Sequence, residues 1–227
     1  MRILVITGAG VSAESGIPTF RGKDGYWRNL DPLKLATPEA FARDPELVWQ
    51  WYGERRDHIR TAKPNAAHEA ITRLSNLAPD FLLVTQNVDD LHARAGMAKE
   101  KMVQIHGDIF LTRCSQCQEQ YREHEQKSAR CCACGALMRP GVVWFGEQLD
   151  PKQIEIVETF LGRGPVDLTL VVGTTALFGY IMDWAVRGGR ELIEVNPELT
   201  ALSHYATKIV REAAAIAVPR IVSEIGL

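Results

Sequence analysis

Four short apolar runs are spaced along the chain, and each is followed by glycine or polar residues. The runs are rich in Val, Ile and Leu, as is typical of strands buried on both faces, and cover residues 2–7, 81–85, 168–173 and 191–195. Helical patterns lie between them, notably over 65–77 and 176–187. This alternation predicts an α/β fold with a doubly wound parallel sheet. Ligands of such sheets bind at the carboxyl ends of the strands, so we expect the loops after the four runs to meet in one crevice.

Two further segments break the alternation of strand and helix. Residues 17–45 are rich in Pro, Gly and charged residues, and they contain no strand where a dehydrogenase-type fold would place its second one. Residues 111–139 contain all the cysteines of the chain and little apolar pattern. We interpret both segments as excursions from the sheet that together form a smaller lobe.

An amphipathic helix is predicted to begin near residue 45. Residues 44–46 (Asp-Pro-Glu) supply an N-cap acceptor, a proline whose missing N–H costs nothing there, and a carboxylate near the positive end of the helix dipole. One stripe of this helix consists of Val48, Tyr52, Arg55 and Ile59. Arg55 therefore faces whatever Tyr52 faces. The simplest interpretation is that its guanidinium snorkels to water or pairs with a nearby carboxylate.

Composition and charge narrow the class of protein. The chain has 227 residues, of which 46% are hydrophobic and 24% charged, and these values fit one large globular domain or a domain with an insertion. A net charge of -2 does not indicate binding to nucleic acid or to an anionic membrane. The first residues lack the pattern of a signal peptide, and no apolar stretch approaches membrane-spanning length. We therefore expect a cytoplasmic protein.

Five cysteines lie within one short window of the chain. Cys114-x-x-Cys117 is followed, after 13 residues, by Cys131-x-x-Cys134. Two such knuckles are typical of a tetrahedral four-thiolate zinc site, which leaves no open position for water and is therefore structural. Cys132 offers an alternative knuckle with Cys134, although C-x-x-C is the commoner spacing. A redox-active dithiol is the alternative interpretation.

The first apolar run leads into GAGVSA at residues 8–13, which fits the loose dinucleotide pattern G-x-G-x-x-G/A. In that pattern the glycines let the backbone approach a pyrophosphate at a helix N-terminus. A tight strand-to-helix turn without a ligand is the alternative. The acidic residue expected about 20 positions further on has no convincing counterpart, which disfavours an ordinary hydride-transfer enzyme.

Several hydrogen-bonding side chains follow predicted strands. Gln86, Asn87 and Asp89 follow the run at 81–85, and His106 follows Val-Gln-Ile at 103–105, with a glycine next to it that we expect to keep its surroundings open. An isolated histidine usually has no chemical role. In one crevice with the glycine turn, however, these residues would supply hydrogen bonds and a base with a near-neutral pKa. No Ser/His/Asp set has the spacing of a catalytic triad.

The combination and order of these motifs are specific. In chain order they are GAGVSAESGIPTFRG at 8–22, TQNVD at 85–89, LH at 91–92, AG at 95–96, HG at 106–107, the two cysteine knuckles, VWFGE at 143–147, GTT at 173–175 and NP at 196–197. This series resembles the sirtuin family of NAD-dependent protein lysine deacylases over essentially the whole chain. The resemblance implies a Rossmann-like large lobe (1–27, 64–110 and 140–227) and a small lobe made of a helical module (28–63) and a zinc-binding module (111–139).

The resemblance also implies an NAD site. The residues of this site would wrap the phosphates and ribose of NAD, surround its nicotinamide, or hold its adenosine end. They are Gly8, Ala9, Gly10, Ser12, Ala13, Glu14, Thr19, Phe20, Arg21, Tyr26, Trp27, Gln86, Asn87, Val88, Asp89, Gly173, Thr174, Thr175, Asn196, Pro197, Glu198 and Ala214. His106 would be the general base and Asn87 a second catalytic residue. In the family, nicotinamide leaves and the acyl group moves to the ribose as 2′-O-acyl-ADP-ribose.

Substrate recognition is implied in the same way. The acylated lysine peptide would pair with a strand formed by Val143, Trp144, Phe145, Gly146 and Glu147. Tyr52 and Arg55 match the Tyr-x-x-Arg pair of the subclass that prefers succinyl-, malonyl- or glutaryl-lysine. In that subclass a guanidinium binds the distal carboxylate of the acyl chain. Thr19, where many members have aspartate, agrees with this subclass.

The resemblance predicts an NAD-dependent deacylase with residual deacetylase activity, one structural Zn²⁺ per chain, and a monomer with acyl-lysine proteins as partners. Three alternatives stay open. One is a general deacetylase, and another is an ADP-ribosyltransferase or NAD hydrolase, whose chemistry also begins with cleavage of the nicotinamide bond. The third is a nucleotide-sensing zinc module without catalysis.

Overall fold

The computed structural model describes residues 1–19, 32–122, 130–131 and 133–226. Its central element is a six-stranded sheet in which every strand pair is parallel and the strand order is β3-β2-β1-β7-β8-β9. The strands are β1 (Arg2–Thr7), β2 (Asp80–Thr85), β3 (Met102–Gln104), β7 (Val166–Val172), β8 (Gly189–Val195) and β9 (Lys208–Val210). This order reverses its direction beside β1, as in doubly wound nucleotide-binding folds. The predicted fold class is therefore confirmed.

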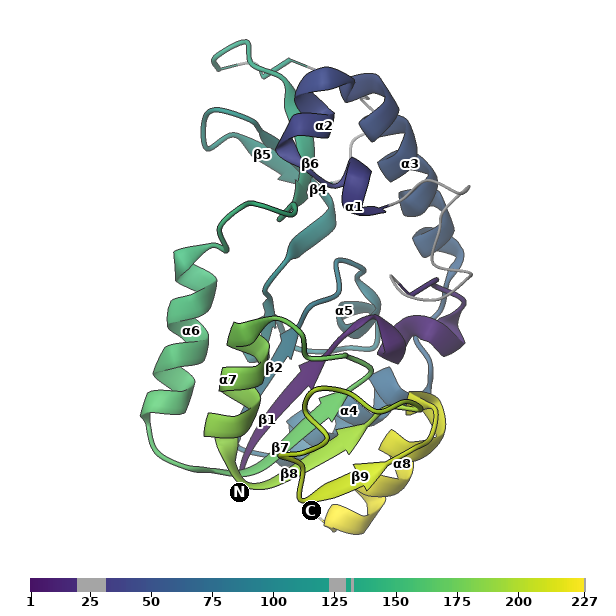
Figure 1. Ribbon diagram of the computed structural model, residues 1–227, viewed down its shortest axis with the longest axis vertical. Helices are drawn as coiled ribbons and strands as arrows, with labels where there is room; N and C mark the ends of the chain where they lie inside the picture. The colour runs from purple at the N-terminus through teal and green to yellow at the C-terminus, as the bar shows by residue number, and fades with distance from the viewer. Residues whose placement is uncertain (20–31, 123–129, 132, 227) are drawn as a thin grey trace.

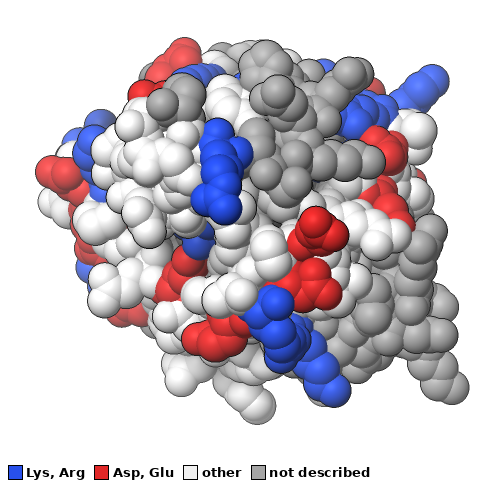
Figure 2. Space-filling model, turned by 90° about the horizontal axis from the view of Figure 1, so that it is seen from above, with Lys and Arg blue, Asp and Glu red and all other residues white. Residues whose placement is uncertain are grey.

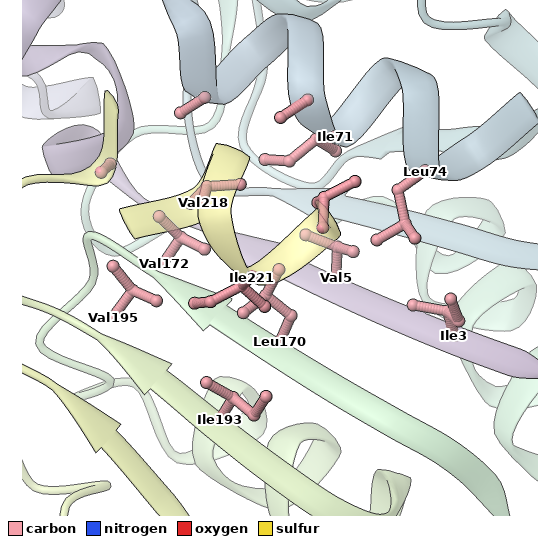
Figure 3. Packing of buried hydrophobic residues seen from close by; sticks show 14 of the residues in the cluster. Ile3, Val5, Ile71, Leu74, Leu170, Val172, Ile193, Val195, Val218 and Ile221 are labelled. Carbon is pink, nitrogen blue, oxygen red and sulfur yellow. The ribbon is translucent and has the colours of Figure 1, made fainter. Parts of the chain in front are cut away.

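Each face of the sheet is covered by a pair of helices (Figure 1). On one face, Ile3 and Val5 of β1 pack beneath α4 (Ala66–Leu77) and α8 (Ala214–Ile225), as Figure 3 shows. On the other face, the alternating residues Leu4 and Ile6 pack with α6 (Pro151–Gly162) and α7 (Gly179–Gly188). Because successive side chains of a strand point to opposite faces, burial on both sides requires an uninterrupted apolar run.

A smaller lobe lies at the top of Figure 1. It consists of an antiparallel sheet, with β4 (Gly107–Cys114) between β5 (Gln120–Arg122) and β6 (Met138–Val142), and of α1 (Pro32–Leu35), α2 (Pro38–Arg43) and α3 (Pro45–Thr61). Trp49 of α3 is buried in the core between them and donates its indole N–H to the carbonyl oxygen of Met138 (2.9 Å). Arg56 is buried as well and donates to the carbonyl oxygens of Ile109 and Leu111 (2.5 and 2.9 Å). These bonds attach α3 to β4 and β6.

The predicted helix near residue 45 is confirmed as α3. The Asp44 carboxylate accepts the N–H of Leu47 at 3.0 Å, and Pro45 occupies the first turn. Three short elements complete the described part of the chain: η1 (Ala9–Ser15), α5 (Leu91–Arg94) and η2 (Lys99–Lys101). The segment after the glycine turn is therefore a 3-10 helix, which Gly16 ends with a φ of 83°. The implied lobe boundaries at 110/111 and 139/140 run through β4 and β6.

Charges of both signs are interspersed on the face of the molecule that Figure 2 shows, where Lys and Arg lie beside Asp and Glu. Within the described residues, no helix combines the length and the apolar character needed to cross a membrane.

Candidate active site

The loops after the parallel strands contact one another, as the sequence predicted. After β1, the amide of Gly10 donates to the carbonyl oxygen of Gly173, which follows β7 (2.8 Å). Gln86, after β2, donates its side-chain N–H to the Thr174 hydroxyl oxygen (2.9 Å). Asn196, after β8, donates its side-chain N–H to the carbonyl oxygen of Thr174 (3.1 Å). One loop after β7 therefore connects the loops after β1, β2 and β8.

Three glycines allow this close approach. A Cβ at Gly8 would lie 2.7 Å from Cβ of Thr174, and one at Gly10 would lie 2.7 Å from Cα of Gly173. Gly173 has a φ of 62°, and a Cβ there would lie 2.5 Å from the amide nitrogen of Val11. These distances are far below the contact distance of about 3.5–4.0 Å between carbon atoms. The glycines of GAG and GTT are thus required by loop-to-loop packing, apart from any ligand.

A buried hydrogen-bond network lies beneath the glycine turn. The Ser12 hydroxyl donates to Oδ2 of Asp89 (3.0 Å) and accepts the side-chain N–H of Asn87 (3.1 Å). His68 Nε2 lies 3.3 Å from the same hydroxyl, and His68 Nδ1 accepts the N–H of Asn65 (3.3 Å). Nδ1 therefore holds the lone pair and Nε2 holds the proton. The network fixes the orientation of Asn87 and Asp89.

Burial changes the ionisation of this network. It lowers the pKa of His68 to about 4, so the imidazole is neutral at pH 7. Burial raises the pKa of Asp89 to about 6, although hydrogen bonds from the Leu91 amide and the Ser12 hydroxyl act in the opposite direction. The charge of Arg55 also favours the Asp89 carboxylate. Asp89 is therefore mainly ionised at neutral pH.

His106 lies between β3 and β4, at the boundary between the two lobes. Its Nδ1 lies 2.9 Å from the carbonyl oxygen of Gln86, and its Nε2 lies 2.5 Å from the hydroxyl oxygen of Tyr180. Burial lowers the pKa of His106, and the contact with Gln86 raises it. Gly107 has a φ of 84°, and a Cβ there would lie 2.3 Å from the carbonyl oxygen of Gly141. This glycine is needed for the approach of β4 and β6, whereas the sequence suggested that it kept the histidine accessible.

Tyr52 and Arg55 lie on the inward side of α3. The Tyr52 hydroxyl is buried and accepts the indole N–H of Trp144 (3.0 Å), and burial raises the pKa of Tyr52 to about 12. The guanidinium of Arg55 lies over the ring of Trp51, 4.6 Å from its centroid. Burial lowers the pKa of Arg55, whereas the nearby Tyr52 and Asp89 raise it. Arg55 thus brings a positive charge close to Tyr52 and Asp89.

Residues 143–147 follow β6 but form no strand in this structure. The amide of Val143 donates to the carbonyl oxygen of His106 (2.8 Å), which places this loop next to the histidine. Trp144 is buried, and its ring lies 3.4 Å from Cζ of Arg139. The Glu147 carboxylate accepts hydrogen bonds from Arg139 and from the Trp144 amide (2.8 Å). Glu147 therefore stabilises the conformation of the loop through these hydrogen bonds.

Most of the remaining residues implied in NAD binding lie on or near these loops. The Glu14 carboxylate accepts the N–H of Ala215 at the start of α8 (3.3 Å), next to the buried Ala214. The residues that lie in or beside the contacting loops are Ala9, Ala13, Thr19, Val88, Thr175, Pro197 and Glu198. Four of the implied residues lie outside the described residues: Phe20, Arg21, Tyr26 and Trp27.

The cysteines of the two knuckles converge at one end of the small lobe. The Sγ atoms of Cys114, Cys117, Cys131 and Cys134 all lie within 4.8 Å of one another. Three of the Sγ pairs lie 3.4–3.7 Å apart, beyond the length of a disulfide bond. A tetrahedral zinc ion with Zn–S bonds of about 2.3 Å would hold its sulfurs about 3.8 Å apart. The four thiols therefore fit a zinc ion. Cys132 lies outside the described residues.

Three residues of this region were not predicted from the sequence. His68 supports Ser12, Arg139 lies against Trp144, and Tyr180 contacts His106. His68 occupies the third position of α4 after the N-cap Asn65, where it completes a capping box, and this local pattern was the available signal. Tyr180 lies 74 positions from His106, and Arg139 is close to Trp144 in sequence but in no regular element shared with it, so neither had such a signal.

A family model described as the Sir2 family matches residues 8–178 of the chain. The chain belongs to the Sir2 family. The sirtuin resemblance expected from the motifs is thereby confirmed. A relative from Leptospira interrogans, named NAD-dependent protein deacylase, is 40% identical over 232 residues that cover 99% of this chain and 93% of that protein. A relative of the same name from Pyrococcus furiosus is 43% identical over 236 residues, which cover 98% and 92%.

Solved Sir2 structures have the same fold. A Sir2 homologue in complex with ADP-ribose is 40% identical, with a TM-score of 0.90, and the match covers 99% of this chain and 91% of that one. A Sir2 homologue in complex with NAD has the same identity and TM-score, and the match covers 99% of this chain and 89% of that one.

Proposed function

We propose that this Sir2-family enzyme uses NAD to remove acyl groups from protein lysines and prefers succinyl, malonyl and glutaryl groups. Residual deacetylase activity accompanies this preference, and the products are nicotinamide and 2′-O-acyl-ADP-ribose. The observation that carries the preference is the position of Arg55 on the inward side of α3, near the buried hydroxyl of Tyr52.

Electrostatics supports this preference. An acetyl group has no charge for a guanidinium to recognise, whereas a succinyl group ends in a carboxylate that a guanidinium binds through two parallel hydrogen bonds. Burial opposes the charge of Arg55, and a second carboxylate offsets that cost in addition to Asp89. A hydrogen bond to a charged group contributes about 1.5–3 kcal/mol. Loss of this contact should therefore lower kcat/KM for a succinylated peptide by about 10- to 150-fold.

The proposed general base is His106. The carbonyl oxygen of Gln86 can only accept a hydrogen bond, so Nδ1 of His106 carries the proton and Nε2 holds the lone pair. Because burial lowers its pKa, the imidazole is neutral at pH 7 and able to take a proton. We assign Asn87 the second catalytic role, since its amide is fixed by Ser12 within the same crevice. NAD, when bound, supplies the ribose whose bond to nicotinamide breaks.

The remaining site assignments belong to the same proposal. The loops that contain Ser12, Gln86, Gly173 and Asn196 would hold NAD, and the loop at 143–147 would hold the substrate backbone. The four cysteine thiolates would hold one structural Zn²⁺. The amides of Gln116 and Cys117 both donate to Sγ of Cys114 (3.4 Å each), an arrangement that suits a zinc-bound thiolate. The lobe boundaries, the monomeric state and the cytoplasmic location stay predictions.

The test compares Arg55→Met with Arg60→Met. Arg60 lies on the same helix, but its side chain is half-exposed and paired with Asp57, so the control removes a guanidinium away from the proposed pocket. Initial rates of nicotinamide release are measured with succinyl- and acetyl-lysine versions of one peptide. We expect Arg55→Met to remove the succinyl preference and Arg60→Met to retain it. Equal wild-type kcat/KM values on both peptides, unchanged in Arg55→Met, would contradict the succinyl preference and indicate a general deacetylase.

A further inference from the structure

The hydroxyl of Tyr180 contacts Nε2 of His106, the ring nitrogen that must accept a proton in the proposed mechanism. Tyr180 is the second residue of α7, and its hydroxyl oxygen lies 2.5 Å from Nε2 of His106. The other ring nitrogen of His106 lies 2.9 Å from the carbonyl oxygen of Gln86. Both nitrogens of the imidazole are therefore engaged by the protein in this structure.

The direction of the contact follows from its partners. Nδ1 must donate, because a carbonyl oxygen has no proton to give, and a neutral imidazole then has only one lone pair, on Nε2. Burial raises the pKa of Tyr180, so the phenol keeps its proton. The Tyr180 hydroxyl therefore donates to Nε2 of His106.

The ring of Tyr180 is held by aromatic contacts. It is stacked on Phe178, with centroids 5.6 Å apart and an angle of 19°, and meets Trp184 edge-on at 5.2 Å. The indole N–H of Trp184 donates to the Glu158 carboxylate (2.7 Å), which ties this cluster to α6. The ring of Phe178 also meets the His106 imidazole at 5.5 Å. These contacts depend on the rings and not on the Tyr180 hydroxyl.

We propose that Tyr180 is a positioning residue that caps Nε2 of His106 and competes with a ribose hydroxyl of NAD for the same lone pair. The proposal rests on the proposed role of His106 as the base toward that ribose. A single lone pair accepts one strong hydrogen bond, so the ribose hydroxyl reaches Nε2 only after the phenol has moved away. The cap keeps the histidine in the tautomer that the reaction needs and reduces the affinity for the ribose.

The test uses Tyr180→Phe, which removes the hydroxyl and keeps the ring stacked on Phe178. Dissociation constants are measured by calorimetry for ADP-ribose, which carries the competing ribose, and for ADP, which lacks it. A net hydrogen bond is worth about 0.5–1.5 kcal/mol, so Tyr180→Phe should bind ADP-ribose about fivefold more tightly and ADP as the wild type does. The matched control is Tyr205→Phe, a hydroxyl deletion at an exposed turn residue, which should change neither constant.

A second measurement reads the contact without catalysis. In ¹⁵N-histidine NMR spectra of the ligand-free enzyme, the Nε2 signal of His106 should shift in Tyr180→Phe and stay in place in Tyr205→Phe. Unchanged ADP-ribose affinity, weaker ADP-ribose binding, or an equal change for ADP-ribose and ADP would overturn the cap. Failure of the base role is seen separately, as undiminished nicotinamide release by a His106→Ala variant, because the NMR shift does not depend on turnover.

Discussion

The contact between the loops after β1 and β7 makes Gly10→Ala a direct test of how these loops pack. The added methyl carbon would lie 2.7 Å from Cα of Gly173 and 2.9 Å from its carbonyl oxygen. Since carbon atoms pack at about 3.5–4.0 Å, the two loops must separate by about 1 Å. The hydrogen bond of 2.8 Å from the Gly10 amide to Gly173 lies at the same place and lengthens with them.

The expected cost combines these two effects. Overpacking against rigid backbone costs about 1–3 kcal/mol and a weakened hydrogen bond about 1 kcal/mol, so Gly10→Ala should lower the free energy of unfolding by about 2–4 kcal/mol. For a chain of this size the melting temperature should fall by roughly 5–15 °C. NAD binding should weaken as well, because the displaced loop carries Ser12 and with it the support of Asn87.

Urea unfolding and calorimetric NAD binding measure both effects. Gly162→Ala in α6 is the control, since a Cβ at that position meets no atom within 4 Å, and it should leave stability and NAD affinity at or slightly above the wild-type values. A Gly10→Ala protein with wild-type stability and wild-type NAD affinity would refute the packing of these loops against each other.

Three further predictions concern the network, the pocket and the cysteines. Because the pKa of His68 is about 4 in the folded state and about 6.5 when unfolded, the unfolded state binds more protons below pH 6.5, so this group should remove about 1.5 kcal/mol of stability between pH 6.5 and pH 5. NMR titration should find His68 neutral throughout that range, and protonation near pH 6.5 would contradict the burial argument. Tyr52→Phe leaves the Trp144 indole N–H without its acceptor and should lower the free energy of unfolding in urea by about 1–3 kcal/mol, whereas an unchanged value would show that the bond contributes nothing. Cys131→Ser should lose bound zinc and the circular dichroism of the small lobe, and Cys132→Ser should retain both; the reverse result would assign the knuckle to Cys132.

Much of the fold could be predicted because the information is local. β1 reproduces the apolar run at 2–7, since a strand buried on both faces has no polar position to interrupt it. The start of α3 followed from Asp44 and Pro45, which act within one helical turn. β9 was not predicted, because it has three residues and two of them are exposed. α8 was not predicted either, and Pro219 in its interior argues against a helix from sequence alone.

For the candidate site as well, some features could be predicted from the sequence and others could not. Loop positions such as Gln86 and His106 could be predicted, because parallel strands bring their carboxyl ends to one edge. Contacts between distant segments could not, because no spacing encodes them. The Tyr180 hydroxyl reaches His106 across 74 positions of the sequence, and the Trp144 indole reaches Tyr52 across 92. The guanidinium of Arg55 could be placed on its stripe, but the proximity of Asp89 required the packing of both lobes.

The most direct test of the proposed function identifies the products by mass spectrometry. The enzyme is incubated with NAD and a succinyl-lysine peptide, and each product is quantified against the nicotinamide released. We predict one succinylated ADP-ribose and one unmodified lysine peptide for each nicotinamide. Free ADP-ribose with an intact succinyl-lysine peptide, or a peptide carrying ADP-ribose, would contradict the deacylase and indicate an NAD hydrolase or an ADP-ribosyltransferase instead.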